Sequence, residues 1–191
     1  MSSKTKSYSK KKIVALIFII IIFVLMPSSI FMTYYSRMEI VSGIETINPE
    51  GTRGRVFVVY RPGISSFQKD MTYAFIEGLT SNGWIVDVTT SSSQTPTNLN
   101  KYDLLVLGSP TYGSRPHQSI LTYLERVGNL NKKKTIIIVT AVASADNTIA
   151  VTKDAVKSAN GVVIKSLAIN AIANIESVSR DICFQAGKSI L

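Results

Sequence analysis

The chain has 191 residues, a formal net charge of +9 and a single cysteine. This length suits one domain plus an additional segment, and one cysteine excludes an internal disulfide framework and a cysteine-based metal cluster. Residues 1–37 hold six lysines and arginines and no acidic residue. Most of the positive charge therefore belongs to the N-terminal end, and we expect no nucleic-acid partner.

The N-terminal end has the layout of a membrane anchor. Residues 1–12 form a basic tail with five lysines, and residues 13–35 carry no charge. A helix needs about 20 apolar residues to cross a bilayer, whereas the unbroken apolar run, residues 13–26, has 14 residues and stops at Pro27. We favour an uncleaved single-pass transmembrane helix. A cleaved signal peptide, whose apolar region is shorter, is the alternative.

The charges around this segment predict an orientation in the cell membrane. Lysines before the span keep the N-terminus in the cytoplasm, and the same rule sends the rest of the chain outside the cell. Residues 36–54 contain Asn48-Pro49 and several glycines, which is typical of a linker. They are expected to join the anchor to a domain formed by residues 55–191.

In this domain, short apolar runs alternate with amphipathic patterns. Strands are expected at residues 55–60, 84–88, 102–108, 134–142 and 161–169. Helical stripes lie within residues 67–79, 120–127, 149–159 and 175–190. Residues 89–100 are too polar for a full helix. Strands that are apolar on both faces and alternate with helices predict an α/β fold with a doubly wound, five-stranded parallel sheet in the order 2-1-3-4-5.

With that strand order, ligands bind at the carboxyl edge of the sheet, where the loops after the first, third and fourth strands meet. The first of these loops has a tight Pro62-Gly63 turn, followed by Ser65 and Ser66 at the start of a helix. A helix N-terminus suits a phosphate group. A serine at that position also serves as an ordinary N-cap.

The loop after the third strand contains the sequence GSPTYG, residues 108–113. Tyr112 either offers its ring to a flat ligand or packs on a neighbouring loop. His117, the only histidine of the chain, is interpreted as a surface or capping residue at the next helix. The loop after the fourth strand, residues 140–148, is small and polar, so a flat ring could approach its backbone.

The order of strands, the turn YRPGISS and above all GSPTYGSRP resemble the flavodoxin-like family over residues 55–191. The resemblance implies non-covalent FMN, with its phosphate in the first loop and its ring between the other two. The FMN-binding residues that it implies are Arg61, Pro62, Gly63, Ile64, Ser65, Ser66, Gln68, Ser109, Pro110, Thr111, Tyr112, Gly113, Ala143, Ser144 and Asp146.

Two positions depart from the family pattern. Ser66 stands where glycine is common, and Gln68 where threonine or serine is expected. The resemblance implies an electron carrier or reductase in which the flavin does the redox chemistry, without a catalytic side chain or a metal. A redox protein or a membrane quinone would be its partner. The alternative is a flavodoxin-like scaffold with weak or no flavin binding that acts as a membrane accessory or binding module.

Overall fold

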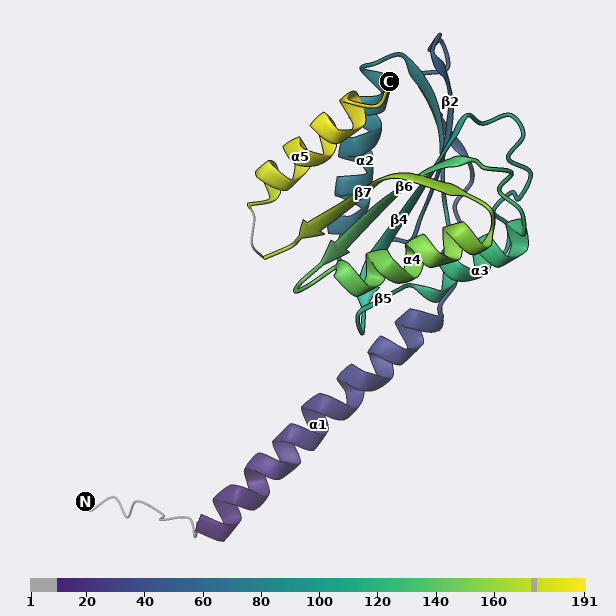
Figure 1. The fold of residues 1–191 in the computed structure, drawn as a ribbon. Coiled ribbons are helices and arrows are strands. Elements are labelled where there is room, and N and C mark those ends of the chain that lie inside the picture. The colour runs from purple at the N-terminus through teal and green to yellow at the C-terminus, as the bar shows by residue number, and fades with distance from the viewer. Residues whose placement is uncertain (1–9, 173–174) are drawn as a thin grey trace. The chain divides into compact units, whose positions relative to one another are not determined.

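A computed structural model describes residues 10–172 and 175–191 (Figure 1). The chain divides into two compact units, Met1–Met38 and Glu39–Leu191. The first unit contains helix α1 (Lys10–Arg37), which continues through Pro27. The second unit contains the sheet and the remaining helices, and it is the part of the chain that carries the candidate site.

Helix α1 corrects the expectation of a membrane anchor. Within the residues that the structure describes, no helix has both the length and the apolar character needed to cross a membrane. The predicted transmembrane helix over residues 13–35 is therefore wrong, and so is the cell-membrane location derived from it. The physical reason is length, because the apolar run 13–26 is shorter than the roughly 20 residues that a bilayer requires.

The second unit is built on a mixed sheet. Its seven strands, counted within the described residues, are β1 (Glu45–Ile47), β2 (Gly54–Tyr60), β3 (Trp84–Thr90), β4 (Leu104–Tyr112), β5 (Arg115–Pro116), β6 (Lys134–Ala141) and β7 (Val162–Asn170). The helices of this unit are α2 (Phe67–Thr80), α3 (Gln118–Val127), α4 (Asp146–Ser158) and α5 (Glu176–Lys188).

The predicted five-stranded, purely parallel sheet is wrong, because two short strands make the sheet mixed. Strand β1 pairs antiparallel with β3 at one edge, and β5 pairs antiparallel with the end of β4. Strands of two or three residues are too short to give a recognisable pattern in the sequence. Within the sheet, the parallel strands lie side by side in the order β3-β2-β4-β6-β7, so the carboxyl ends of β2 and β4 are neighbours.

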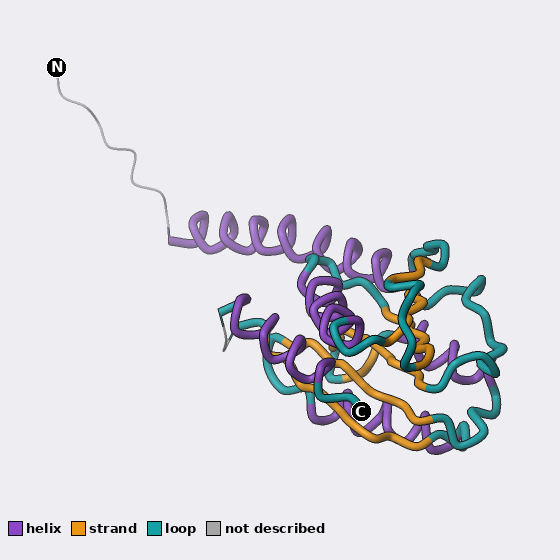
Figure 2. Tube along the Cα trace, turned by 90° about the horizontal axis from the view of Figure 1, so that it is seen from above, coloured by secondary structure: helices purple, strands orange, loops and turns teal. Residues whose placement is uncertain are grey.

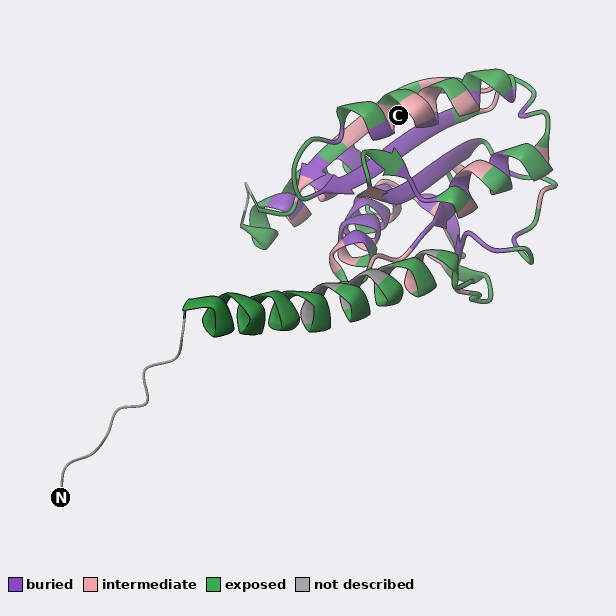
Figure 3. Cartoon of the chain, turned by 90° about the horizontal axis from the view of Figure 1, so that it is seen from below, coloured by how far each residue is buried: buried purple, intermediate pink, exposed green. Residues whose placement is uncertain are grey.

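The sheet lies between two pairs of helices, with α2 and α5 on one face and α3 and α4 on the other (Figures 1 and 2). Strand β2 shows why both pairs are needed. Val56 and Val58 belong to the cluster under α2 and α5, while Phe57 and Val59 belong to the cluster on the opposite face. Because successive side chains point to opposite faces, β2 is buried on both sides (Figure 3).

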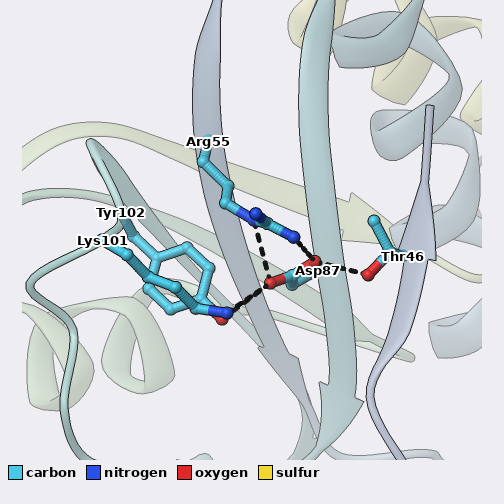
Figure 4. A network of polar contacts seen from close by, with 5 residues as sticks. All are labelled: Thr46, Arg55, Asp87, Lys101 and Tyr102. Carbon is cyan, nitrogen blue, oxygen red and sulfur yellow. Dashed lines mark hydrogen bonds and ion pairs between the residues drawn. The ribbon is translucent and has the colours of Figure 1, made fainter. Parts of the chain in front are cut away.

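A buried carboxylate fixes the edge of the sheet near β1. Asp87 on β3 is 1% exposed and accepts hydrogen bonds from four side chains (Figure 4). The donors are Thr46 Oγ1 at 2.7 Å, Arg55 Nε and Nη2 at 3.1 and 3.0 Å, Lys101 Nζ at 3.1 Å and Tyr102 OH at 2.8 Å. The network joins β1, β2 and β3 to the irregular segment, residues 91–103, that leads into β4.

Candidate functional site

The loops that follow β2 and β4 lie side by side at the carboxyl edge of the sheet. The backbone N–H of Arg61 donates to the carbonyl oxygen of Gly108 at 2.9 Å. A Cβ atom added at Gly63 would stand 3.9 Å from Pro110 Cβ, which is ordinary van der Waals distance. The two segments that the sequence singled out are therefore in contact.

The loop after β2 leads into helix α2 with several polar groups facing outward. Ser65 and Ser66 are exposed, and Ile64 is 50% exposed. Ser66 is the N-cap residue of α2, yet its side chain makes no capping hydrogen bond within the described part of the chain. Since the first N–H groups of a helix have no partner inside the helix, this end of α2 keeps donors for an anion.

Two residues of this loop are buried rather than exposed. Arg61 is 0% exposed, and Gln68 is 1% exposed. The Gln68 side chain accepts from Thr140 Oγ1 at 2.7 Å and donates to Thr72 Oγ1 at 3.1 Å. Gln68 thus ties the first turn of α2 to the end of β6.

The stretch around Tyr112 is more regular than the sequence suggests. The expected strand stopped at residue 108, whereas β4 continues to Tyr112 and turns back into β5. Gly113 and Ser114 have φ values of 53° and 61°, and Tyr112 pairs with Arg115. Positive φ at both central residues is typical of a type I′ hairpin turn. Tyr112 in this hairpin is half-buried.

The hairpin also contains a buried polar atom without a partner. Thr111 Oγ1 is buried and makes no hydrogen bond within the described residues. The Ser109 hydroxyl, by contrast, makes two hydrogen bonds. It accepts from the backbone N–H of His117 at 2.9 Å and donates to the Pro110 carbonyl at 2.9 Å. Ser109 thus fixes the backbone of the hairpin, whereas the Thr111 hydroxyl is buried and has no hydrogen-bond partner within the described residues.

The loop after β6 completes the edge. Asn147 Nδ2 donates to the Ser114 carbonyl at 2.7 Å, which links the start of α4 to the β4–β5 hairpin. Ala143 and Ser144 are exposed, and Ser144 Oγ donates to Asp146 Oδ2 at 2.9 Å while it accepts from the Asp146 N–H at 3.1 Å. This loop holds its own shape through these bonds.

Residues that the sequence did not single out also belong to this edge. Val142 is 67% exposed at the end of the most apolar strand, so it offers an apolar surface beside Ala143. The sequence did not reveal this exposure, because Val142 continues the apolar run of the expected strand, residues 134–142. Ser91 and Ser119 join His117 in a hydrogen-bonded chain. No local pattern reveals that meeting, because Ser91 lies 28 residues before Ser119 in the chain.

The strand order and the three joined loops can now be compared with known proteins. No protein-family model matches the chain, and no curated protein matches its sequence. Solved structures do match. A flavodoxin from the domain Archaea is 15% identical over 71% of this chain and 95% of its own, with a TM-score of 0.59. The fold is flavodoxin-like.

Two further structures share this flavodoxin-like fold. Two-electron reduced Megasphaera elsdenii flavodoxin is 17% identical, with a TM-score of 0.57, over 70% of this chain and 99% of its own. An NAD(P)H:quinone oxidoreductase from Methanothermobacter marburgensis is 14% identical, with a TM-score of 0.54, over 72% and 96%. At such identities the likeness is one of fold, and a ligand must be argued from the residues.

Those residues fit a flat, phosphorylated ligand better than a metal ion. Within residues 10–172 and 175–191, no group of three or more His, Cys, Asp or Glu side chains is placed to hold a metal ion. The edge instead offers the start of α2 for an anion, and the half-buried Tyr112 and the exposed Val142 for an apolar ring face. FMN combines an anionic group with a flat ring.

Proposed function

We propose that residues 39–191 bind FMN at this edge and transfer electrons through it. The observation that carries the proposal is the meeting of three loops, joined by the Arg61–Gly108 and Asn147–Ser114 hydrogen bonds, next to a helix whose N-cap residue, Ser66, makes no capping bond within the described residues. A flavodoxin-like fold supports the same reading, since ligands of such sheets bind at the carboxyl edge beside the strand-order switch.

The first loop would hold the phosphate. Backbone N–H groups from residues 61–68 and the hydroxyls of Ser65 and Ser66 would donate to its oxygens, and the dipole of α2 would favour its negative charge. Pro62 and Gly63 would set the tight turn that brings the backbone close. Gln68 would act indirectly, because its buried carboxamide fastens the first turn of α2 to Thr140.

The other two loops would hold the ring. Tyr112 would stack on it, and the backbone of Pro110, Thr111 and Gly113 would meet its polar edge. Ala143, Ser144 and Asp146 would approach from the other side. Bound FMN would supply one- and two-electron redox chemistry, so the chain itself would need to bind, orient and shield the ring rather than provide a catalytic acid or base.

A redox protein or a quinone would exchange electrons with such a site. A flat quinone could approach the ring over the exposed Val142, which is apolar. A redox protein would dock over the same edge. Turnover of a quinone by the FMN-loaded protein with a chemical reductant would favour a reductase, whereas transfer only to a protein acceptor would favour a carrier.

The proposal is tested by titrating the full chain with FMN and with riboflavin while flavin fluorescence is followed. We expect FMN to bind and riboflavin, which lacks the phosphate, to bind more weakly. Ser66→Glu should weaken FMN binding by about 10-fold or more, because a carboxylate at the start of α2 repels the phosphate while it suits the helix dipole.

Ser177→Glu is the matched control, since Ser177 is an exposed serine in the first turn of α5. It should bind FMN like the unmodified chain. A protein that is folded, colourless after native purification and without effect on FMN fluorescence would refute the proposal. That outcome would favour the alternative, a flavin-free scaffold that acts as a binding module, for which the commitment of Gln68 to Thr72 and Thr140 is the supporting observation.

A further inference from the structure

The only histidine of the chain forms the N-cap of helix α3. His117 is 7% exposed, and its Nδ1 atom accepts a hydrogen bond from the Ser119 N–H at 3.1 Å. An N-cap side chain must accept a hydrogen bond in order to satisfy a free N–H group of the first helical turn. The cap therefore requires that Nδ1 carries no proton.

His117 also connects three segments of the candidate site. Its ring meets the ring of Tyr112 edge-on, with centroids 5.9 Å apart and planes at 72°, and its backbone N–H donates to Ser109 Oγ at 2.9 Å. Ser119 Oγ lies 2.9 Å from Nδ1 and 2.6 Å from Ser91 Oγ at the end of β3. One imidazole thus fixes the β4–β5 hairpin, the start of α3 and the segment after β3 relative to one another.

Protonation of the imidazole would work against the cap of α3. A proton on Nδ1 removes the acceptor that caps α3, and a positive charge is unfavourable at the positive end of a helix dipole. The charges nearby along the chain add to this. Arg115 on β5 precedes His117 by two residues, the first turn of α3 contains no acidic residue, and Asp146 at the start of α4 is exposed and bonded to Ser144.

We propose that His117 is a positioning residue whose protonation state sets the place of Tyr112. The neutral imidazole caps α3 and holds the Tyr112 ring. The imidazolium releases both. Imidazoles change charge between about pH 5 and 8, so the hairpin is fixed above this window and loosened as the pH falls through it. The consequence for the ligand rests on the proposed flavin site: as the hairpin loosens, the affinity for FMN decreases.

The test uses NMR of the full chain, because a single histidine gives a single set of imidazole signals. At pH 7.5 we expect the tautomer with its proton on Nε2, and on acidification the ring signals of Tyr112, assigned with Tyr112→Phe, should shift with the same midpoint as His117. An Nδ1–H tautomer at pH 7.5, or a Tyr112 ring that does not respond, would overturn the proposal.

Two variants and FMN titrations extend the test to the ligand. The unmodified chain should bind FMN about fivefold more weakly at pH 5 than at pH 7.5, as expected for loss of an N-cap that stabilises the binding-competent state. His117→Asn keeps a capping acceptor that does not titrate, so it should remove this pH dependence and retain the affinity at pH 7.5. His117→Ala should be weak at both pH values.

These results separate the two proposals. The phosphate of FMN itself titrates near this window, so a pH dependence that persists in His117→Asn would belong to the ligand and would count against His117. If no variant binds FMN at any pH, the proposed function fails. The NMR titration of the ligand-free chain still decides whether His117 positions Tyr112.

Discussion

Asp87 is a buried carboxylate at the edge of the sheet near β1. It accepts from Thr46, Arg55, Lys101 and Tyr102 while it is 1% exposed. Asp87→Asn removes the negative charge and leaves one side-chain oxygen to accept hydrogen bonds, whereas both carboxylate oxygens accept them in the unmodified chain. We expect a loss of about 2 kcal/mol or more in the free energy of unfolding, in line with hydrogen bonds to charged groups, measured by urea unfolding.

The matched control is the exposed ion pair between Arg180 and Glu77, whose nitrogen and oxygen lie 3.3 Å apart. Glu77 is 59% exposed at its side chain. Glu77→Gln should change the free energy of unfolding by no more than about 0.5 kcal/mol, because exposed pairs contribute little. Equal effects of the two variants would show that burial of Asp87 is energetically unimportant.

The same carboxylate predicts how stability responds to acid. Burial raises the pKa of Asp87, but the hydrogen bonds from Arg55, Thr46, Tyr102 and Lys101 outweigh it and hold the pKa well below its usual range. A lowered pKa means that the stabilisation is complete above the unfolded-state value of about 4 and is lost as the pH falls below it. The stability difference between the unmodified chain and Asp87→Asn should therefore shrink between about pH 4 and pH 2 in urea-unfolding series.

At the residue scale, the sequence predicted which segments form the edge but not which side chains face outward. Ser65 and Tyr112 were predicted to lie at this edge because turn residues and a lone aromatic follow apolar runs. Gln68 was assigned to the phosphate by family position, whereas it is buried against Thr140. That contact depends on β6, which lies 66 or more residues further along the chain, so no local pattern contains it.

At the scale of elements, helices α2 and α5 cross at two glycines. A Cβ atom added to Gly78 would stand 2.1 Å from the Phe184 carbonyl oxygen, and one added to Gly187 would stand 2.1 Å from the Phe75 carbonyl oxygen. Gly78→Ala should force the helices apart and destabilise the fold by about 1–3 kcal/mol, as overpacking does. Thermal unfolding followed by circular dichroism would measure this.

Gly43→Ala serves as the comparison, because an added Cβ at Gly43 meets no atom within 4 Å. Its stability should equal that of the unmodified chain. If Gly78→Ala were as stable as Gly43→Ala, the close crossing of α2 and α5 would not be a requirement of the fold.

Element boundaries show where sequence patterns reach their limit. Alternation and apolar runs locate β2, β3, β6 and β7 because both faces of these strands are buried in part or in full. They miss the extension of β4 to Tyr112, since Ser109, Pro110 and Gly113 are typical of turns. Pairing with β5 supplies the hydrogen bonds that keep this stretch extended, and such pairing is a tertiary effect that overrides local preference.

At the scale of the whole molecule, the single cysteine reports on global unfolding. Cys183 on α5 is 0% exposed, and burial raises the pKa of its thiol to about 12. A thiolate is the reactive form, so the folded chain should resist alkylation at pH 8. Labelling should become fast only at urea concentrations that unfold the chain, and rapid labelling in native buffer would contradict the tight docking of α5 on the sheet and α2.

The order of the parallel strands followed from the alternation of apolar runs and helical stripes, because few arrangements bury strands on both faces. The mixed character of the sheet and the nature of α1 did not follow. The three residues of β1 lie in a stretch read as a linker. The apolar composition of residues 13–35 suggested a membrane span that the length of the run does not support.

The two faces of the sheet are closed by different chemistry. On one, helices pack through aliphatic side chains and backbone contact. On the other face, part of the cover is the coil at residues 91–103, which is held by hydrogen bonds to charged side chains. Asp87 accepts from Tyr102, Arg126 donates to the Ser92 and Thr95 carbonyls, and Glu39 accepts from the Ser93 N–H. High salt weakens exposed charged contacts, such as those of Arg126 and Glu39, more than it weakens aliphatic packing. Amide hydrogen exchange in this coil should consequently accelerate first, so that the protein loosens from one side while its other half stays protected.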